Sequence, residues 1–139
     1  MSAELEIQNA IYDTLANDYA LGAVVKGVYD AVPQADDSGD AEVFPYVTVG
    51  DDTALDWNTD TSNGKEATIT IHSWSRYRGR KEIKEIQGLI YDALHLAPIT
   101  VTGYNVVEIW SEYSESLMDP DGLTRHGVQR FRLIIDKEI

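Results

Sequence analysis

The spacing of hydrophobic residues changes within residues 66–95, and this change is the clearest structural signal in the chain. Ile69 and Ile71 alternate with polar residues, which is the period of a strand with one buried face. After a basic run at 76–81, apolar residues recur every three or four positions: Ile83, Ile86, Leu89, Ile90, Ala93 and Leu94. That spacing predicts an amphipathic helix, which Pro98 would end because proline cannot continue a helix. A strand leading into a helix is the expected centre of the core.

The same patterns predict the other elements. Apolar spacing indicates a helix at 2–17 and a further helical turn at 18–23, which Asp18 would cap. Alternation or short apolar runs predict strands at 24–29, 44–50, 106–114 and 128–135. Residues 33–42 and 51–64 read as long polar loops, and 118–122 as a proline- and glycine-containing turn.

These elements predict an α+β fold in a single domain spanning 1–139. We expect a mainly antiparallel sheet of four to five strands with two helices packed on one face. The 51–64 loop would connect one hairpin and the 118–122 turn a second one. The patterns leave the order of the strands across the sheet open.

The net charge of the chain narrows the classes of function that this protein can have. The chain has 24 acidic and 11 basic residues and a net charge of −13. Such a protein is a poor general DNA binder, because binding to polyphosphate needs clustered cations, and its carboxylates would repel DNA that passes close by. The absence of cysteine excludes disulfides and thiolate metal sites and fits a cytoplasmic protein. There is no apolar run near the ~18 residues that a membrane span needs, and no signal-peptide pattern.

No motif predicts catalysis, a cofactor or a metal site. His72, His95 and His126 lack the spacing of zinc ligands, so structural roles are the simpler interpretation. The acidic groups at 36–40 and 56–60 do not fit a calcium loop, since Thr61 stands where that loop needs glycine. A catalytic group assembled only by the fold stays possible at this point.

One positive cluster and one unusual tryptophan are the candidate contact residues. Arg76, Arg78, Arg80 and Lys81 could contact DNA, form a solvated helix start, or pair with an acidic region of a second copy in a head-to-tail ring. The third interpretation suits an acidic chain best. Trp57, in a polar loop, has little local reason to be buried, and exposed tryptophans are enriched at interface hot spots.

The order of several short motifs resembles the tail-completion, or tail-terminator, family of long-tailed phages and related gene-transfer agents. The matching pieces are Tyr19-Ala20-Leu21, Val28-Tyr29-Asp30-Ala31-Val32-Pro33, Phe44-Pro45-Tyr46-Val47, Asp56-Trp57, His72-Ser73-Trp74-Ser75, the segment 119–128, and Arg130-Phe131-Arg132. They cover nearly the whole chain. The resemblance implies a small α+β subunit of a homohexameric ring, with no catalytic residues, cofactor or metal to carry over.

In that family the ring caps the finished tail tube, ends its polymerisation and joins it to the head–tail connector, with DNA passing through the bore. The partners implied are the tail tube protein, the connector or stopper, and DNA in transit without specific binding. The protein would be in the host cytoplasm during assembly and then at the tail–neck junction of the particle.

We expect Arg76, Arg78, Arg80 and Lys81 at the subunit interface. The expected contacts with tube, connector or bore involve five residues: Asp51, Asp52, Asp56, Trp57 and Asp60. Two alternatives stay open, a head-side stopper or adaptor of the neck, and a small soluble enzyme or ligand-binding module.

Overall fold

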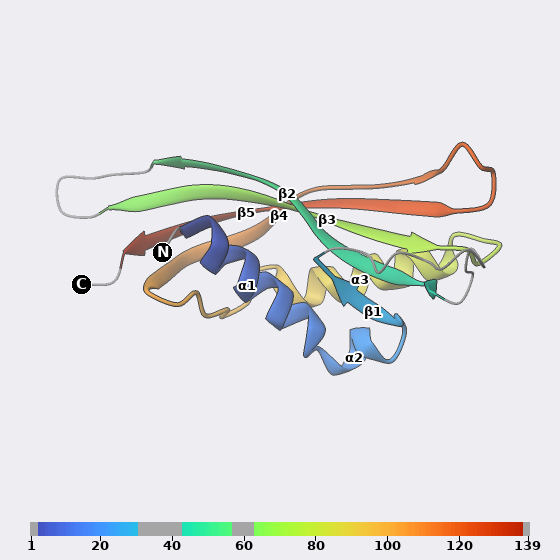
Figure 1. Cartoon of the computed structure of the whole chain (residues 1–139), viewed down its shortest axis with the longest axis horizontal. Helices are drawn as coiled ribbons and strands as arrows, with labels where there is room; N and C mark the ends of the chain where they lie inside the picture. Colours follow the sequence, from blue (N-terminus) through green and yellow to red (C-terminus); the bar gives the residue numbers. More distant parts are fainter. Residues whose placement is uncertain (1–2, 31–42, 57–62, 138–139) are drawn as a thin grey trace.

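A five-stranded sheet with helices on one side forms the molecule (Figure 1). The computed structural model describes residues 3–30, 43–56 and 63–137. The polar loop expected at 33–42 and the central part of the 51–64 connection lie outside the described residues. Within the described part of the chain, no helix has the length and apolar character needed to cross a membrane.

The helices form where the apolar spacing predicts them. α1 (Ala3–Ala16) buries Ile7, Ile11 and Leu15 against the sheet. α2 (Tyr19–Gly22) is a single turn, and the Asp18 carboxylate caps it by accepting a hydrogen bond from the Leu21 amide at 2.9 Å. α3 (Lys81–Leu94) has His95 as its C-cap residue and therefore ends before Pro98.

The strands confirm both expected hairpins and supply the order that the sequence left open. They are β1 (Gly27–Tyr29), β2 (Tyr46–Asp56), β3 (Gly64–Ser75), β4 (Tyr104–Met118) and β5 (Arg125–Lys137). The order across the sheet is β1-β2-β3-β5-β4. β1 pairs with β2 in parallel, and all other neighbours are antiparallel. The α+β fold with a mainly antiparallel sheet is therefore confirmed.

The prediction of a polar loop from Asp51 onward is wrong for the first six residues. β2 continues to Asp56 after a register shift between Val49 and Asp52. Aspartate and threonine have low and context-dependent strand preference, so the sequence pattern breaks there. Pairing with β3 overrides that preference: Thr53 and Thr68 share a hydroxyl hydrogen bond, and Asp56 forms an ion pair with Lys65 at 2.8 Å.

One face of the sheet and the helices enclose the core. Alternate residues of β3 and β5 point toward the helices, and Ile69 lies opposite Phe131 in the register. Both are at most 1% exposed, as are Ile86 and Ile90 of α3. Burying each of these large side chains contributes about 1.5–3 kcal/mol.

A hydrogen-bonded glutamine fixes α3 on the sheet. Gln87 donates from Nε2 to the backbone carbonyl of Glu115 at 2.8 Å. The backbone carbonyl of Gln87 accepts a hydrogen bond from Gln129 Nε2 at 2.9 Å. The Gln87 side chain lies directly over Gly127, where a Cβ atom would be 2.6 Å from Nε2. The missing side chain of Gly127 therefore permits the close approach of α3 to β5.

The two hairpins end at opposite ends of the sheet (Figure 1). β3 begins beside the end of β5, where Gly64 lies opposite Asp136, and the β4–β5 turn lies at the other end of the sheet. This separation determines which of the candidate residues can meet within one molecule.

Candidate functional site

The predicted basic residues lie together between the end of β3 and the first turn of α3. Arg76 places its guanidinium 4.3 Å from the centre of the Phe44 ring and donates from Nε to Thr124 Oγ1 at 3.2 Å. Arg80 is the N-cap residue of α3, but its side chain does not cap the helix. Lys81 is the first residue of the helix, so Arg80 and Lys81, two of the four predicted residues, lie at its N-terminus.

The fold adds Arg125 to this group, which sequence reasoning missed. Arg125 donates from Nη2 to the Arg78 carbonyl at 3.4 Å across 47 positions of sequence. We call Arg76, Arg78, Arg80, Lys81 and Arg125 the basic cluster. None of the five forms an ion pair with a carboxylate of the described residues.

Arg130 and Arg132, which lie further along β5, are already paired. Glu112 accepts hydrogen bonds from Arg130 at 2.8 Å and from Arg132 at 2.6 Å. The hydrogen bond from Arg132 is the main reason why the pKa of Glu112 lies below its ordinary value. Arg132 also lies 3.4 Å from Glu66. The basic cluster is therefore distinct from Arg130 and Arg132, whose charges are compensated.

The predicted acidic contact residues lie on β2, away from the basic cluster. Asp51 and Asp52 are exposed, and Asp56 pairs with Lys65 at 2.8 Å. Trp57 and Asp60 lie outside the described residues. The register places Tyr46 opposite Trp74 and Asp56 opposite Lys65, so β2 runs away from the basic cluster. At ~3.3 Å per residue, Asp56 is roughly 30 Å from the end of β3.

Two histidines that look isolated in sequence meet on the uncovered face of the sheet. His72 Nδ1 and His126 Nε2 are 2.8 Å apart, and the His126 ring stacks on Trp74 with a centroid distance of 3.8 Å. Burial, together with the neighbouring His72, lowers the pKa of His126. The spacing in sequence gave no sign of this pair, because cross-strand pairing brings the two histidines together over 54 positions.

Within the described residues, the histidine pair does not belong to a metal-binding group. Among the residues described, no group of three histidine, cysteine or acidic side chains could hold a metal ion. His95 also has a structural contact, since its Nδ1 accepts a hydrogen bond from the Ser111 amide at 3.0 Å.

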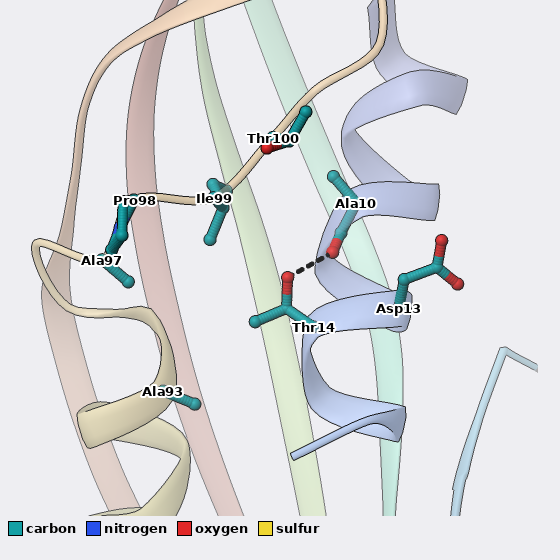
Figure 2. Close-up of a pocket in the computed structure, with 8 residues that line it drawn as sticks. All are labelled: Ala10, Asp13, Thr14, Ala93, Ala97, Pro98, Ile99 and Thr100. Atoms are coloured by element: carbon teal, nitrogen blue, oxygen red, sulfur yellow. Dashed lines mark hydrogen bonds between the residues drawn. The ribbon is translucent and has the colours of Figure 1, made fainter.

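A shallow groove separates α1 from the segment that follows α3 (Figure 2). Its volume is about 460 Å³, and apolar side chains dominate the lining: Ala10, Ala93, Ala97, Pro98 and Ile99. The Thr14 hydroxyl is occupied, since it donates to the Ala10 carbonyl at 2.7 Å. Asp13 lies at the rim with its side chain directed away from the 97–100 segment. A groove with one carboxylate at its edge lacks the convergent polar groups of an enzyme pocket.

The structure thus defines a small α+β protein that carries a basic cluster at the end of β3 and exposed carboxylates on β2 of an elongated sheet. The model of a protein family described as "Tail completion protein gp17" matches residues 9–136. The chain belongs to this tail completion family, a family of structural proteins and not of enzymes.

Individual relatives agree with this assignment. The chain is 28% identical over 134 residues to the tail completion protein gp17 of Bacillus phage SPP1, covering 96% of this chain and 95% of the relative. A chain in a structure of the virion of a native gene transfer agent particle shares the fold, with a TM-score of 0.85, 24% identity and coverage of 97% and 98%. The structure of bacteriophage SPP1 gp17 has a TM-score of 0.59 at 24% identity, with coverage of 94% and 89%.

Proposed function

We propose that this protein is a tail terminator, a subunit of a homohexameric ring at the tail–neck junction of a phage or gene-transfer-agent particle. The ring caps the finished tail tube, ends its polymerisation and joins it to the head–tail connector. The observation that carries the proposal is the family match over residues 9–136. The fold likeness to a chain of a gene transfer agent virion, at a TM-score of 0.85, supports it.

The basic cluster is the proposed subunit interface. Its arginines have no carboxylate partners among the described residues of their own chain. A second copy with a net charge of −13 offers such partners in excess. The basic cluster of one copy can therefore meet an acidic region of the next, head to tail. Contacts of this heterologous kind close into a ring when the rotation between copies permits it.

The β2 carboxylates are proposed to face the bore or the rings above and below. Asp51 and Asp52 are exposed on β2, and a row of such carboxylates around a channel keeps DNA from adhering to its wall. Asp56 lies beside the connection that holds Trp57 and Asp60, and we assign all three to contacts with the tail tube protein or the connector. DNA would therefore pass through without specific binding.

The proposed role depends on shape and charge and uses no catalytic group, cofactor or metal. The protein would fold in the host cytoplasm during assembly and end as a component of the particle. Its proposed partners are copies of itself, the tail tube protein and the head–tail connector or stopper.

Electron microscopy of particles that lack this protein tests the proposal. A tail terminator stops growth of the tube, so its loss should give tubes of uncontrolled length that do not join to heads. Gold labelling of a tagged copy should then mark the head-proximal end of free, headless tails. Label on tailless heads would instead indicate a head-side stopper, and tails of normal length joined to heads in the absence of the protein would exclude both roles.

A further inference from the structure

Three titratable side chains lie in a row at the end of the β4–β5 hairpin, and the proposed function uses none of them. His126 of β5 lies between Asp119 of the turn and His72 of β3. The distance from His126 Nε2 to His72 Nδ1 is 2.8 Å, and His126 Nδ1 is 3.7 Å from the Asp119 carboxylate. Each nitrogen of the His126 ring therefore faces another titratable group.

Packing holds the His126 ring in this position. The Trp74 indole stacks on it with a centroid distance of 3.8 Å and an angle of 9° between the two planes. The side chains of His126 and Asp119 are only 16% and 26% exposed. Because water reaches these groups poorly, their polar contacts must be made largely within the row.

The positions of the hydrogens in the row follow from the carboxylate of Asp119. A carboxylate only accepts hydrogen bonds, so it favours a hydrogen on Nδ1 of His126, whereas a bare Nδ1 would direct its lone pair at the negative charge. A neutral imidazole carries one hydrogen on its nitrogens, so His126 Nε2 is then the acceptor and His72 Nδ1 the donor. Each hydrogen of the row therefore points toward Asp119.

The charges that act on His126 come from β3, β4 and the turn. Burial, and then the proximity of His72, lower the pKa of His126, while the carboxylates of Asp119 and Glu115 act in the opposite direction. The row thus combines one group that opposes a second positive charge with two carboxylates that tolerate a first one.

The neighbours on the β2 side keep their charge state near neutral pH. Tyr46 lies opposite Trp74 in the register, and burial raises its pKa, so the phenol stays neutral. Arg76 is always charged, and it donates to Thr124 Oγ1 at 3.2 Å. Between about pH 5 and 8 histidine is the side chain whose charge ordinarily changes, so the two imidazoles are the groups that respond.

One added proton leaves the row joined, and a second one breaks it. When the first proton enters at Nε2 of His72, this ring still donates from Nδ1 to His126, and the Asp119 carboxylate offsets the added charge. A second proton removes the last acceptor between the rings and places two cations in contact. The row therefore has two states that differ by one proton.

We propose that Asp119, His126 and His72 form a proton-sensitive lock that ties the β4–β5 turn to β3 and opens when both imidazoles are charged. In the open state His126 keeps Asp119 and Trp74 as partners, since both favour a cation, and His72 turns away. Arg76 and Arg125 of the basic cluster adjoin the same turn, so opening the lock changes how this cluster is presented. The lock belongs to the single chain and does not depend on the proposed ring.

Nitrogen-15 spectra of the histidine side chains test the hydrogen positions. At about pH 7.5, well above the ordinary pKa of histidine, His72 and His126 should both carry their hydrogen on Nδ1. His95 is the internal control, because its Nδ1 accepts from the Ser111 amide at 3.0 Å and its hydrogen must therefore be on Nε2. A hydrogen on Nε2 of His126 at this pH overturns the proposal.

An acid titration of the same signals tests the opening. The wild type should take up two protons in steps at least about one pH unit apart, and the nuclear Overhauser contacts between the two rings should disappear in the second step. In Asp119→Asn the second step should move to lower pH by roughly half a unit or more, because the compensating charge is lost. Asp13→Asn removes an equal charge from α1, on the other side of the sheet, and should leave both steps unchanged.

The variant His72→Gln isolates the contribution of the pair. His126 should then titrate in one step, at a higher pH than the second step of the wild type, and keep its contact with Trp74. Ring contacts that persist after both steps, or equal shifts in Asp119→Asn and Asp13→Asn, overturn the lock. Loss of the β3 amide signals in the second step would mean global unfolding and would equally overturn a local lock.

Discussion

His72 Nδ1 lies 2.8 Å from His126 Nε2, although the two residues are 54 positions apart. One ring donates the hydrogen and the other accepts it, so the bond requires at least one neutral imidazole. Protonation of both rings would place two positive charges in contact on the uncovered face of the sheet. The pair therefore makes the stability of the folded chain sensitive to acid.

We predict that the protein loses stability as the pH falls below about 6.5. Burial, and then the proximity of His72, lower the pKa of His126 below 6.5. The folded chain therefore binds this proton more weakly than the unfolded chain, so the stabilisation is complete above about pH 6.5 and declines as the pH falls through the lower folded value. Thermal unfolding of the wild type and His126→Gln, followed across this range, measures the effect.

The His126→Gln variant should show a smaller decrease of the unfolding midpoint over this range. Above about pH 7.5 the His126 imidazole is neutral, so the difference between the two proteins should be constant there. Equal pH dependence of wild type and variant below that point would contradict this role of His126.

A second prediction concerns the close approach of Gln87 to Gly127. Gly127→Ala should destabilise the protein by about 1–3 kcal/mol, because the new Cβ atom would overlap the Gln87 side chain. Gln87→Ala should lower the free energy of unfolding by about 1 kcal/mol, because it removes the hydrogen bond to the Glu115 carbonyl. In the double variant the side chain that would overlap is absent. The double variant should therefore lose less free energy of unfolding than the two single variants lose together. Urea unfolding of the four proteins gives the coupling energy.

Gly88 provides the control for that experiment. It lies on α3 next to Gln87, but nothing lies within 4 Å of the position of its missing Cβ atom. Gly88→Ala should therefore stabilise the helix by up to about 1 kcal/mol. If Gln87→Ala and Gly127→Ala lower the free energy of unfolding additively, the Gln87 side chain and the new Cβ atom at position 127 do not interfere.

A third prediction concerns the turn at the end of the β4–β5 hairpin. Hydrogen bonds from the Thr124 and Leu123 amides hold the pKa of Asp121 below its ordinary value. Asp121→Ala removes the acceptor, so the amide hydrogens of Leu123 and Thr124 should exchange with solvent faster, while those of β3 should not change. Hydrogen exchange measured by nuclear magnetic resonance provides the comparison. Unchanged protection of both amides would show that the carboxylate does not hold the turn.

Local patterns were sufficient to predict most of the fold. The 3.6-residue spacing located α1 and α3, and alternation located β3 and β5, because each pattern reflects one buried face. Both hairpins were predictable, since their strands are neighbours in sequence. The pairing of β3 with β5 and the parallel pairing of β1 with β2 were not, because they join segments far apart in sequence. The end of β2 was missed because pairing overrides the low strand preference of its aspartates.

In the candidate site, too, some residues are evident from the sequence and others are brought together only by the fold. Arg76, Arg78, Arg80 and Lys81 form one continuous run, so the sequence shows the cluster directly. Arg125 joins them only through the register of β3 with β5, where it lies opposite Ser75. The groove beside α1 depends on three-dimensional packing, and no periodic signal marks it.

The last prediction concerns the effect of salt on association of the subunits. If the basic cluster holds neighbouring copies together, raising the salt from about 0.1 M to about 1 M shortens the screening length from about 10 Å to about 3 Å and should favour dissociation. Arg78→Glu should weaken association and reduce this salt dependence. Lys137→Glu changes the charge equally at the opposite end of the sheet and should leave association nearly unchanged. Sedimentation velocity of the three proteins distinguishes these outcomes, and equal weakening by both substitutions would attribute the effect to net charge alone.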